Sequence, residues 1–353
     1  MTTITPCFII TGASSGIGEK LAKIYSERNI NIVLAARSTD KLNKLALELK
    51  SINKFSNKYL VVSYDASKES DCKNLIEIVI KQFGRIDLLL LCAGVSYHNS
   101  FKDTTDLNVY RQMMDINYFG YMYTTYYALP YMIKQQQKQS TNNNNNSNNK
   151  PQIAVISSIS GALGLPLRAG YCASKFAVNG FFQALRLEVQ SYVDITLLLP
   201  TTVNTPMRSH SLGDPNEKKL IHFHGEDDSK KMTIDQCCEI VIAAIDGRKK
   251  KVAFPFSNFL ASVLHPIFPN YIDKILLKKA GGTNLINSNS NSNNNNNNTL
   301  KSKLMKEVKE KKKKKRLQSQ ILAQNYLIIY RFKKKNDTIT LHPLKTHSHS
   351  PKK

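Results

Sequence analysis

The fold is decided by one short stretch of the sequence, Phe8-Ile9-Ile10-Thr11-Gly12-Ala13-Ser14-Ser15-Gly16-Ile17-Gly18. A β-branched run leads into three spaced glycines, and a helical apolar pattern follows. In that context the glycines allow a tight turn, a close approach to a pyrophosphate and close helix packing, while the helix N-terminus offers N–H groups to an anion. A plain Gly/Ser turn is the alternative. We expect a dinucleotide site built from Gly12, Ser14, Ser15, Gly16, Ile17 and Gly18.

Five further apolar runs follow, at residues 31–35, 60–62, 86–91, 153–156 and 195–199. They do not alternate between apolar and polar residues, which is typical of strands buried on both faces. Helical patterns lie between them, as in the spacing of Cys72, Leu75, Val79 and Phe83. This alternation predicts an α/β fold with a single Rossmann-like, doubly wound parallel sheet of about seven strands and helices on both faces.

Composition excludes several classes of protein. The chain has 353 residues, of which 41% are hydrophobic, and this is enough for a sizeable core. Six cysteines with no C-x-x-C pair argue against a disulfide scaffold and a structural zinc site, so we expect no metal. Lys and Arg number 50 against 26 Asp and Glu, for a net charge of +24. Much of this excess lies in residues 299–353, with 17 basic and three acidic side chains.

Two Asn-rich tracts divide the chain. We predict a folded domain at residues 1–283 with a disordered Asn-rich insertion at 139–150, an Asn/Ser-rich linker at 284–298 and a disordered basic tail at 299–353, since these tracts have few apolar residues to offset the entropy of ordering. The insertion joins a helix expected at about 117–138 to a strand, and it therefore lies at the amino edge of the sheet, opposite the ligand-binding edge.

Targeting signals are absent from the sequence pattern. The first ten residues are too short for a signal peptide, and no apolar run approaches 18 residues, so we expect a cytoplasmic protein. The basic run Lys311 to Arg316 has no interleaved aromatic residues that could stack on bases, so we expect no specific nucleic-acid partner. Weak association of the tail with anionic membranes stays open.

Two polar residues that follow strands suit a dinucleotide. An NAD site usually places an acidic residue after the second strand, whereas here Arg37 stands there. A guanidinium suits a 2′-phosphate, so we favour NADP(H) over NAD(H). The alternative for Arg37 is a solvated side chain. Asp65, after the third strand, could accept a hydrogen bond from adenine or could simply cap a helix.

A second signal is the sequence Tyr171-Cys172-Ala173-Ser174-Lys175. On a helix Tyr171 and Lys175 share a face, and a nearby cation lowers the pKa of a phenol, which makes Tyr171 a usable acid or base. An exposed Tyr–Lys pair is the alternative. Ser158 ends the preceding strand, where its hydroxyl could hold a carbonyl oxygen. Asn117 begins the helix before that strand, and it could be an ordinary N-cap.

In this order and spacing, these elements resemble the short-chain dehydrogenase/reductase family. Ser158 stands the usual 13 residues before Tyr171. The family's Asn-Asn-Ala-Gly motif appears as Leu91-Cys92-Ala93-Gly94, and its Pro-Gly segment appears as Pro200-Thr201-Thr202-Val203-Asn204-Thr205. Within the family the chain is most similar to the dehydrogenase/reductase member 7 type, through Phe83 to Leu89 and Gly170 to Lys175.

The resemblance implies roles for individual residues. Tyr171 exchanges the proton with the substrate oxygen, and Lys175 binds the nicotinamide ribose and lowers the pKa of the phenol. Ser158 orients the carbonyl, so that Ser158 and Tyr171 bind the substrate, and Asn117 holds a water that links Lys175 to solvent. The cofactor contacts also include Ala93, Gly94, Pro200, Val203 and Thr205.

We therefore expect an NADP(H)-dependent oxidoreductase that interconverts a carbonyl and an alcohol and acts on the CH–OH group of a lipophilic small molecule. The resemblance also implies a homo-oligomer. Two alternatives stay open at this stage. The chain could be a catalytically silent scaffold that binds dinucleotide, or an NAD-dependent alcohol dehydrogenase.

Overall fold

The computed structural model describes residues 5–141, 150–208, 211–213 and 231–279. The chain divides into two compact units, residues 1–285 and 286–353, and all described residues belong to the first. The linker expected at 284–298, the tail expected at 299–353 and residues 142–149 of the expected insertion lie outside the described residues.

Seven parallel strands form one sheet in the order β3-β2-β1-β4-β5-β6-β7. The strands are β1 (Cys7–Thr11), β2 (Asn31–Ala36), β3 (Tyr59–Ser63), β4 (Leu88–Leu91), β5 (Gln152–Ile156), β6 (Asp194–Pro200) and β7 (Lys251–Phe254). This confirms the doubly wound sheet, and β7 supplies the strand that no apolar run had located. The strand order reverses beside β1, which pairs with both β2 and β4, and ligands bind at such a point in open α/β sheets.

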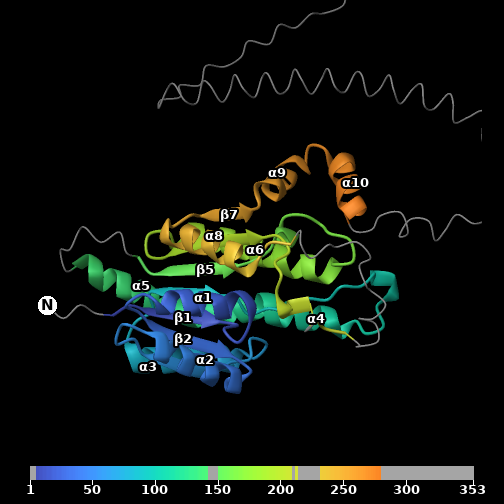
Figure 1. The fold of residues 1–353 in the computed structure, drawn as a ribbon. Helices are drawn as coiled ribbons and strands as arrows, with labels where there is room; N and C mark the ends of the chain where they lie inside the picture. The colour runs from blue at the N-terminus through green and yellow to red at the C-terminus, as the bar shows by residue number, and fades with distance from the viewer. Residues whose placement is uncertain (1–4, 142–149, 209–210, 214–230, 280–353) are drawn as a thin grey trace, which may run out of the picture. The chain divides into compact units, whose positions relative to one another are not determined.

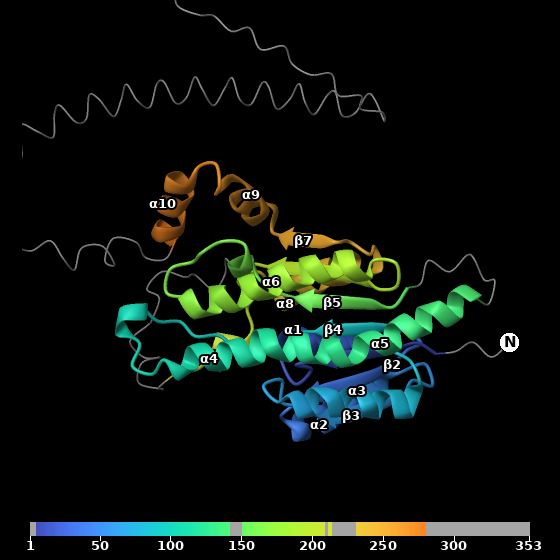
Figure 2. The same cartoon turned by 180° about the vertical axis from the view of Figure 1, so that it is seen from behind.

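In the described part of the chain, three helices cover each face of the sheet (Figures 1 and 2). On one face lie α1 (Gly16–Ser26), α2 (Thr39–Ile52) and α8 (Ile234–Asp246). On the other face lie α3 (Glu69–Phe83), α5 (Gly120–Thr141) and α6 (Ala169–Val189). Successive residues of β1 face opposite cores, because Ile9 packs with the second set and Ile10 with the first. Both cores are apolar, which explains why the strands read as continuous apolar runs.

The helix before β5 differs from its expected limits. It starts at α4 (Asn108–Met114), passes through a π-helical turn (Asp115–Phe119) and continues as α5. The prediction that Asn117 begins a helix is therefore wrong, because Met113 and Val109 are buried one and two turns earlier and extend the helix backwards. At its other end α5 includes residues 139–141, which the sequence had assigned to the insertion.

Among the described residues, two helices follow the last strand. They are α9 (Phe256–Leu264) and α10 (Pro269–Lys279), and Figure 1 shows them beyond β7 at the edge of the sheet. The remaining short elements are 3₁₀ turns at Phe101–Asp103, Ile159–Gly161 and Pro206–Arg208. Within the described part of the chain, no helix is both long enough and apolar enough to cross a bilayer.

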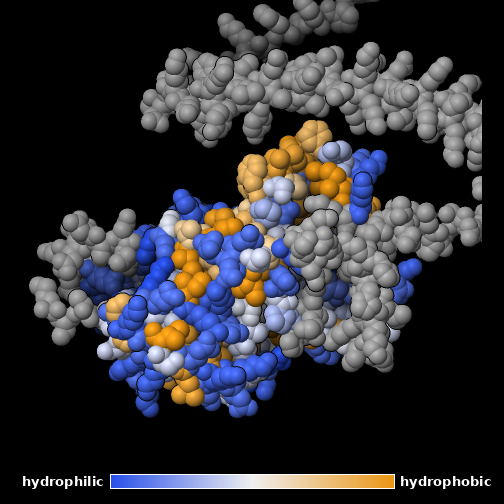
Figure 3. Space-filling model, in the orientation of Figure 1, coloured by the Kyte–Doolittle hydropathy of each residue, from blue (hydrophilic) through white to orange (hydrophobic). Residues whose placement is uncertain are grey.

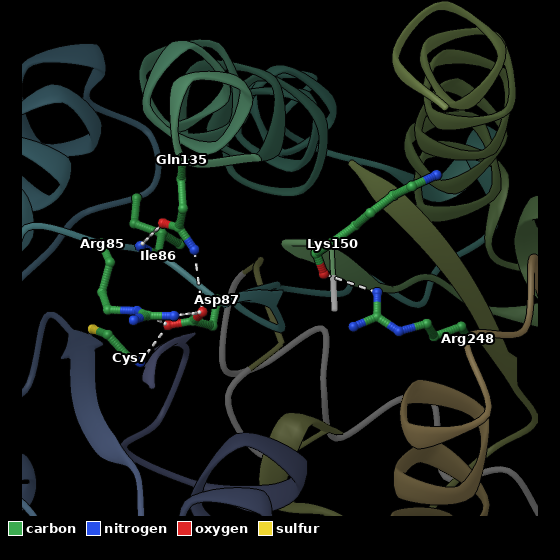
Figure 4. Close-up of polar contacts among 7 residues, drawn as sticks. All are labelled: Cys7, Arg85, Ile86, Asp87, Gln135, Lys150 and Arg248. Atoms are coloured by element: carbon green, nitrogen blue, oxygen red, sulfur yellow. Dashed lines mark hydrogen bonds and ion pairs between the residues drawn. The ribbon is translucent and has the colours of Figure 1, made fainter. Parts of the chain in front are cut away.

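The amino edge of the sheet is held by charged groups (Figure 4). The carboxylate of Asp87 accepts hydrogen bonds from the Cys7 N–H at 2.7 Å, from the Arg85 guanidinium at 2.7 and 2.6 Å, and from the Gln135 amide at 3.1 Å. This one side chain therefore ties β1 to α5. Nearby, Arg248 donates to the Lys150 carbonyl at 2.8 Å, where the chain returns from the expected insertion.

We predict that Asp87→Asn lowers the free energy of unfolding by about 2–3 kcal/mol, because it removes the charge from several hydrogen bonds in a half-buried position. Asp246 is the matched control. It also binds an arginine through both oxygens, at 2.9 and 2.8 Å from Arg28, but on the exposed surface. Asp246→Asn should cost less than about 1 kcal/mol. Urea unfolding of both variants tests this, and equal losses would contradict it.

Candidate functional site

A cavity of about 300 Å³ opens at the carboxyl edge of the sheet. Its walls come from the segments that follow β1 to β6 and from the first turns of α1 and α6. Most of the predicted site residues line it, namely Gly12, Ser14, Ser15, Gly16, Ile17, Arg37, Asp65, Ala93, Gly94, Ser158, Tyr171, Lys175, Pro200, Val203 and Thr205. The fold thus brings together, in one cavity, residues that are up to 193 positions apart, from Gly12 to Thr205. Gly18 and Asn117 lie outside its lining.

The turn between β1 and α1 packs too closely for side chains. Gly12 has a φ of +69°, and a Cβ there would lie 2.8 Å from the backbone of Ala93. A Cβ at Gly18 would lie 2.4 Å from the carbonyl oxygen of Gly12. Gly18 therefore acts through helix packing beneath the turn, whereas Gly12 holds the turn against the segment after β4.

The N-terminus of α1 points its backbone N–H groups at this cavity. Ser15 occupies the N-cap position, but its side chain makes no capping hydrogen bond within the described structure. Helix N-terminal N–H groups have no intrahelical acceptor, and together with the helix dipole they favour an anion. The glycine cradle and this helix end fit the pyrophosphate of a dinucleotide.

Arg37 and Asp65 stand on the rim of the same cavity, beyond β2 and β3. Arg37 is exposed, and Ser38 and Lys41 line the wall beside it. Asp65 accepts hydrogen bonds from the Ser67 N–H at 3.0 Å and the Ser67 hydroxyl at 2.8 Å. Asp65 is therefore not the N-cap of α3, a position that Lys68 occupies.

Tyr171 and Ser158 lie within hydrogen-bonding reach on one wall. Burial raises the pKa of the Tyr171 phenol, while the hydrogen bond with Ser158 and the positive charge of Arg168 lower it. The sequence predicted a phenol pKa lowered by Lys175. The structure shows the opposite net direction, because loss of hydration disfavours the phenolate more than these neighbours favour it. The phenol is thus held protonated, as a proton donor requires.

Lys175 is 3% exposed and reaches the cavity from below Tyr171. Its ammonium donates to the Ile156 carbonyl at 3.1 Å and lies 5.2 Å from the ring centre of Tyr121 and 5.9 Å from that of Tyr171. Burial lowers the pKa of Lys175 to about 8. Its charge therefore depends on pH near neutrality, and a partner with hydroxyl or anionic groups would stabilise the charged form.

Asn117 is fully buried behind the cavity, inside the π-helical turn. Its amide accepts from the Val95 N–H at 2.8 Å and donates to the Val95 carbonyl at 2.9 Å and to the Ser174 hydroxyl at 3.0 Å. Asn117 therefore joins the segment after β4 to α6. A π-helical turn often marks a functional site, because it changes the direction of one side chain within a helix.

Sequence reasoning missed Thr11. Its hydroxyl accepts hydrogen bonds from the N–H groups of Cys92 and Ala93, at 3.0 and 3.3 Å, and lies 3.3 Å from the Leu90 carbonyl, to which it donates. Thr11 thus braces the segment after β4, where two asparagines of the family motif are missing from this sequence. The sequence did offer a signal for this role, because Thr11 ends the first strand directly before Gly12.

The substrate end of the cavity is more polar than the sequence suggested. Met207 lines the cavity, whereas the side chain of Phe101 is 66% exposed and packs on Tyr110. His98 and Arg168 also line it. Arg168 is the N-cap residue of α6, three positions before Tyr171. Residues 209–210 and 214–230, which connect β6 to α8, lie outside the described residues.

Comparison with known proteins agrees with this geometry. A family model described as short chain dehydrogenase matches residues 6–215. The chain is 32% identical over 254 residues to dehydrogenase/reductase SDR family member 7 of Homo sapiens, a match that covers 71% of this chain and 70% of that protein. It is 35% identical over 199 residues to an 11-beta-hydroxysteroid dehydrogenase of Pinus massoniana. That match covers 56% of this chain and about half of the relative, 51%.

Among solved structures, the fold is similar to a short chain dehydrogenase/reductase from Burkholderia phymatum, described in complex with NAD. The TM-score is 0.65 with 19% identity, and the match covers 77% of this chain and 96% of the other. At this level of identity the similarity establishes the shared architecture.

We predict that Asn117→Ala lowers the free energy of unfolding by about 2–4 kcal/mol, because it leaves the partly buried N–H and C=O of Val95 without these partners. Asn108→Ala, at an exposed position on α4, is the control and should change stability by less than about 0.5 kcal/mol. Chemical denaturation followed by circular dichroism measures both. A value for Asn117→Ala close to that of the control would show that the Val95 bonds contribute nothing.

Proposed function

This chain belongs to the short-chain dehydrogenase family, and we propose that it uses NADP(H) to interconvert a carbonyl and an alcohol on a mainly apolar small molecule. As a member of this family it is an oxidoreductase that acts on CH–OH groups. The observation that carries the proposal is the convergence of Tyr171, Ser158 and Lys175 on one wall of the cavity that the glycine turn also lines.

The bound dinucleotide supplies or accepts the hydride. Its pyrophosphate fits the uncapped N-terminus of α1 and the cradle around Gly12, where a Cβ would collide with Ala93. Lys175 is suited to bind the nicotinamide ribose through its ammonium. The side chains of this protein then have to position the substrate oxygen and move one proton.

In the reductive direction Tyr171 donates its phenolic proton to the substrate oxygen as that oxygen gains negative charge. The raised pKa of Tyr171 keeps the proton on the phenol until the transfer, and the hydrogen bond with Ser158 stabilises the phenolate that forms. Ser158 also holds the carbonyl oxygen beside the phenol. Asn117, tied to Val95 and Ser174, fixes the backbone behind Lys175, and we assign to it the water that returns protons from solvent.

Arg37 supports the preference for NADP(H). It follows β2 directly, it is exposed on the rim of the cavity, and Ser38 and Lys41 add donors beside it. No carboxylate stands at the end of β2 to accept hydrogen bonds from a ribose 2′-hydroxyl. A guanidinium binds a phosphate with two charge-assisted hydrogen bonds.

An apolar substrate is supported by the side chains around Tyr171. Tyr97, Val109 and Met113 form a small buried cluster, against which Tyr171 and Leu212 pack. His98 and Arg168 add polar groups at the same end, so the substrate class has a polar substituent as well as an apolar body. Assembly into a homo-oligomer is supported by exposed apolar side chains on α5 and α6, namely Tyr126, Tyr131, Phe176 and Leu187. The cytoplasmic location stays a prediction.

We predict that Tyr171→Phe reduces kcat by roughly 10²–10⁴-fold, because the ring remains but the transferable proton is lost. Dinucleotide affinity should stay within about twofold, since the phenol is not required for pyrophosphate binding. Tyr126→Phe, an exposed tyrosine on α5, is the control and should keep full activity. Steady-state kinetics with a panel of ketones measures the effect. Retained turnover in Tyr171→Phe would refute the assignment.

The pH dependence should follow Lys175. Its pKa of about 8 means that the ammonium is present below that pH and is lost above it. Since kcat/KM for NADPH reports the cofactor-free enzyme, this quantity should fall as the pH rises through about 8. A Lys175→Arg variant keeps its charge at all these pH values, so its remaining activity should not show this falling limb. If kcat/KM of the wild type stays constant from pH 6 to roughly pH 10, where an ordinary lysine begins to lose its proton, Lys175 does not control the pH dependence.

Arg37→Asp should shift the ratio of kcat/KM for NADPH to that for NADH toward NADH by at least about tenfold to a hundredfold. It removes a charge-assisted contact worth about 1.5–3 kcal/mol and places a carboxylate near the 2′ position. Lys44→Asp, an exposed residue of α2, changes net charge equally and should leave the ratio unchanged. A wild-type enzyme that prefers NADH would overturn the NADP(H) assignment and leave the Tyr171 mechanism intact.

A further inference from the structure

The helices α9 and α10 expose an apolar surface, which we call the α9–α10 face. Eight large apolar side chains are exposed along it, between 37% for Ile275 and 72% for Phe256. They are Phe256, Phe259, Leu260, Val263, Ile267, Phe268, Tyr271 and Ile275. None of the nine residues of α9 is buried against the described part of the chain. Figure 3 shows the same concentration of hydrophobic residues over α9 and α10.

The spacing of these residues makes the surface continuous. On α9, Phe256 and Leu260 lie four residues apart, as do Phe259 and Val263, and on α10 Tyr271 and Ile275 repeat this spacing after the turn that holds Ile267 and Phe268. Residues at these intervals share one face of a helix. A helix that packs on a protein core turns such a face inward, whereas here it points outward. Exposed apolar patches of this kind mark an interaction site.

Three lysines lie at or beside the α9–α10 face. Lys251 lines a groove with Phe259 and Val263, and Lys274 and Lys278 are exposed on α10. The nearby carboxylate of Asp273 lies 3.0 Å from His265. α9 itself carries no charged residue. Aromatic and aliphatic side chains on one face with lysines at the border are typical of helices that lie in the interface of a lipid bilayer.

We propose that the α9–α10 face docks on the surface of a phospholipid bilayer that contains anionic lipids. The apolar side chains enter the boundary between headgroups and acyl chains, and the bordering lysines bind the anionic headgroups. A second copy of this chain fits less well, because a twofold contact through this face would bring the same lysines together.

The position of the face connects it to the cavity. α9 packs against β7 and against the 3₁₀ turn Ile159–Gly161, which follows Ser158 directly. A bilayer on the α9–α10 face would therefore lie beside the segment that borders the substrate end. Docking does not depend on the proposed function, but it would supply an apolar substrate from the membrane.

The test is co-sedimentation of the full-length protein with vesicles of phosphatidylcholine alone and of phosphatidylcholine mixed with phosphatidylserine. The patch variant, Phe256→Asp with Ile267→Asp, should lose at least about tenfold in affinity for the mixed vesicles. The control, Leu47→Asp with Ile52→Asp, adds the same charge at exposed apolar positions of α2 and should bind as wild type does. Lys274→Gln with Lys278→Gln should remove the preference for the mixed vesicles.

Dinucleotide binding and thermal melting of each variant check that it is folded. Three results would overturn the proposal: wild type that binds neither vesicle, a patch variant that binds as tightly as the control, or binding that is lost only when Lys311 to Arg316 are replaced by Gln. The last result would assign membrane contact to the tail. Sedimentation velocity without lipid tests whether a second copy of the chain binds the face instead. If wild type self-associates, does not bind vesicles, and loses self-association only in the patch variant, the face belongs to a second copy.

Discussion

The whole site depends on a steric constraint at the turn between β1 and α1. The backbone there folds so tightly that a Cβ at Gly18 would meet the carbonyl oxygen of Gly12 at 2.4 Å. Because no side chain separates the two, the first turn of α1 lies directly over the end of β1. This placement aims its N–H groups into the cavity and sets the turn against Ala93, so that the segments after β1 and β4 share one wall.

Because all strands of the sheet are parallel, their carboxyl ends lie at one edge and their amino ends at the other. The carboxyl edge has open segments and a cavity, and the amino edge is tied by Asp87 and Arg248. The backbone is thus anchored where no chemistry takes place. This division also accounts for the long Asn-rich run between α5 and β5, since both of its described flanks lie at the anchored edge, far from Tyr171.

Much of the fold was readable because local pattern and tertiary structure agree. Continuous apolar runs located six of the strands, and the glycine spacing located the site. Asn117 was misread, because a polar residue in the middle of a helix looks like a cap when the buried positions of α4 are not recognised. The pKa of Tyr171 was misread for another reason. Pair spacing reveals that Lys175 is near, but it does not reveal burial, and burial dominates here. Arg168 lines the cavity because it is the N-cap residue of α6, and the sequence pattern did not reveal where that helix begins.

The π-helical turn at Asp115–Phe119 holds one residue more than an α-helical turn does. Removing one residue there would restore ordinary α-helical hydrogen bonds and keep both flanks in register, with Tyr121, Ala128 and Met132 still in the core that they share with the sheet. The loss would fall on Asn117, whose amide reaches Val95 and Ser174 from within that turn. The extra residue therefore serves the cavity wall and not the packing of the helix.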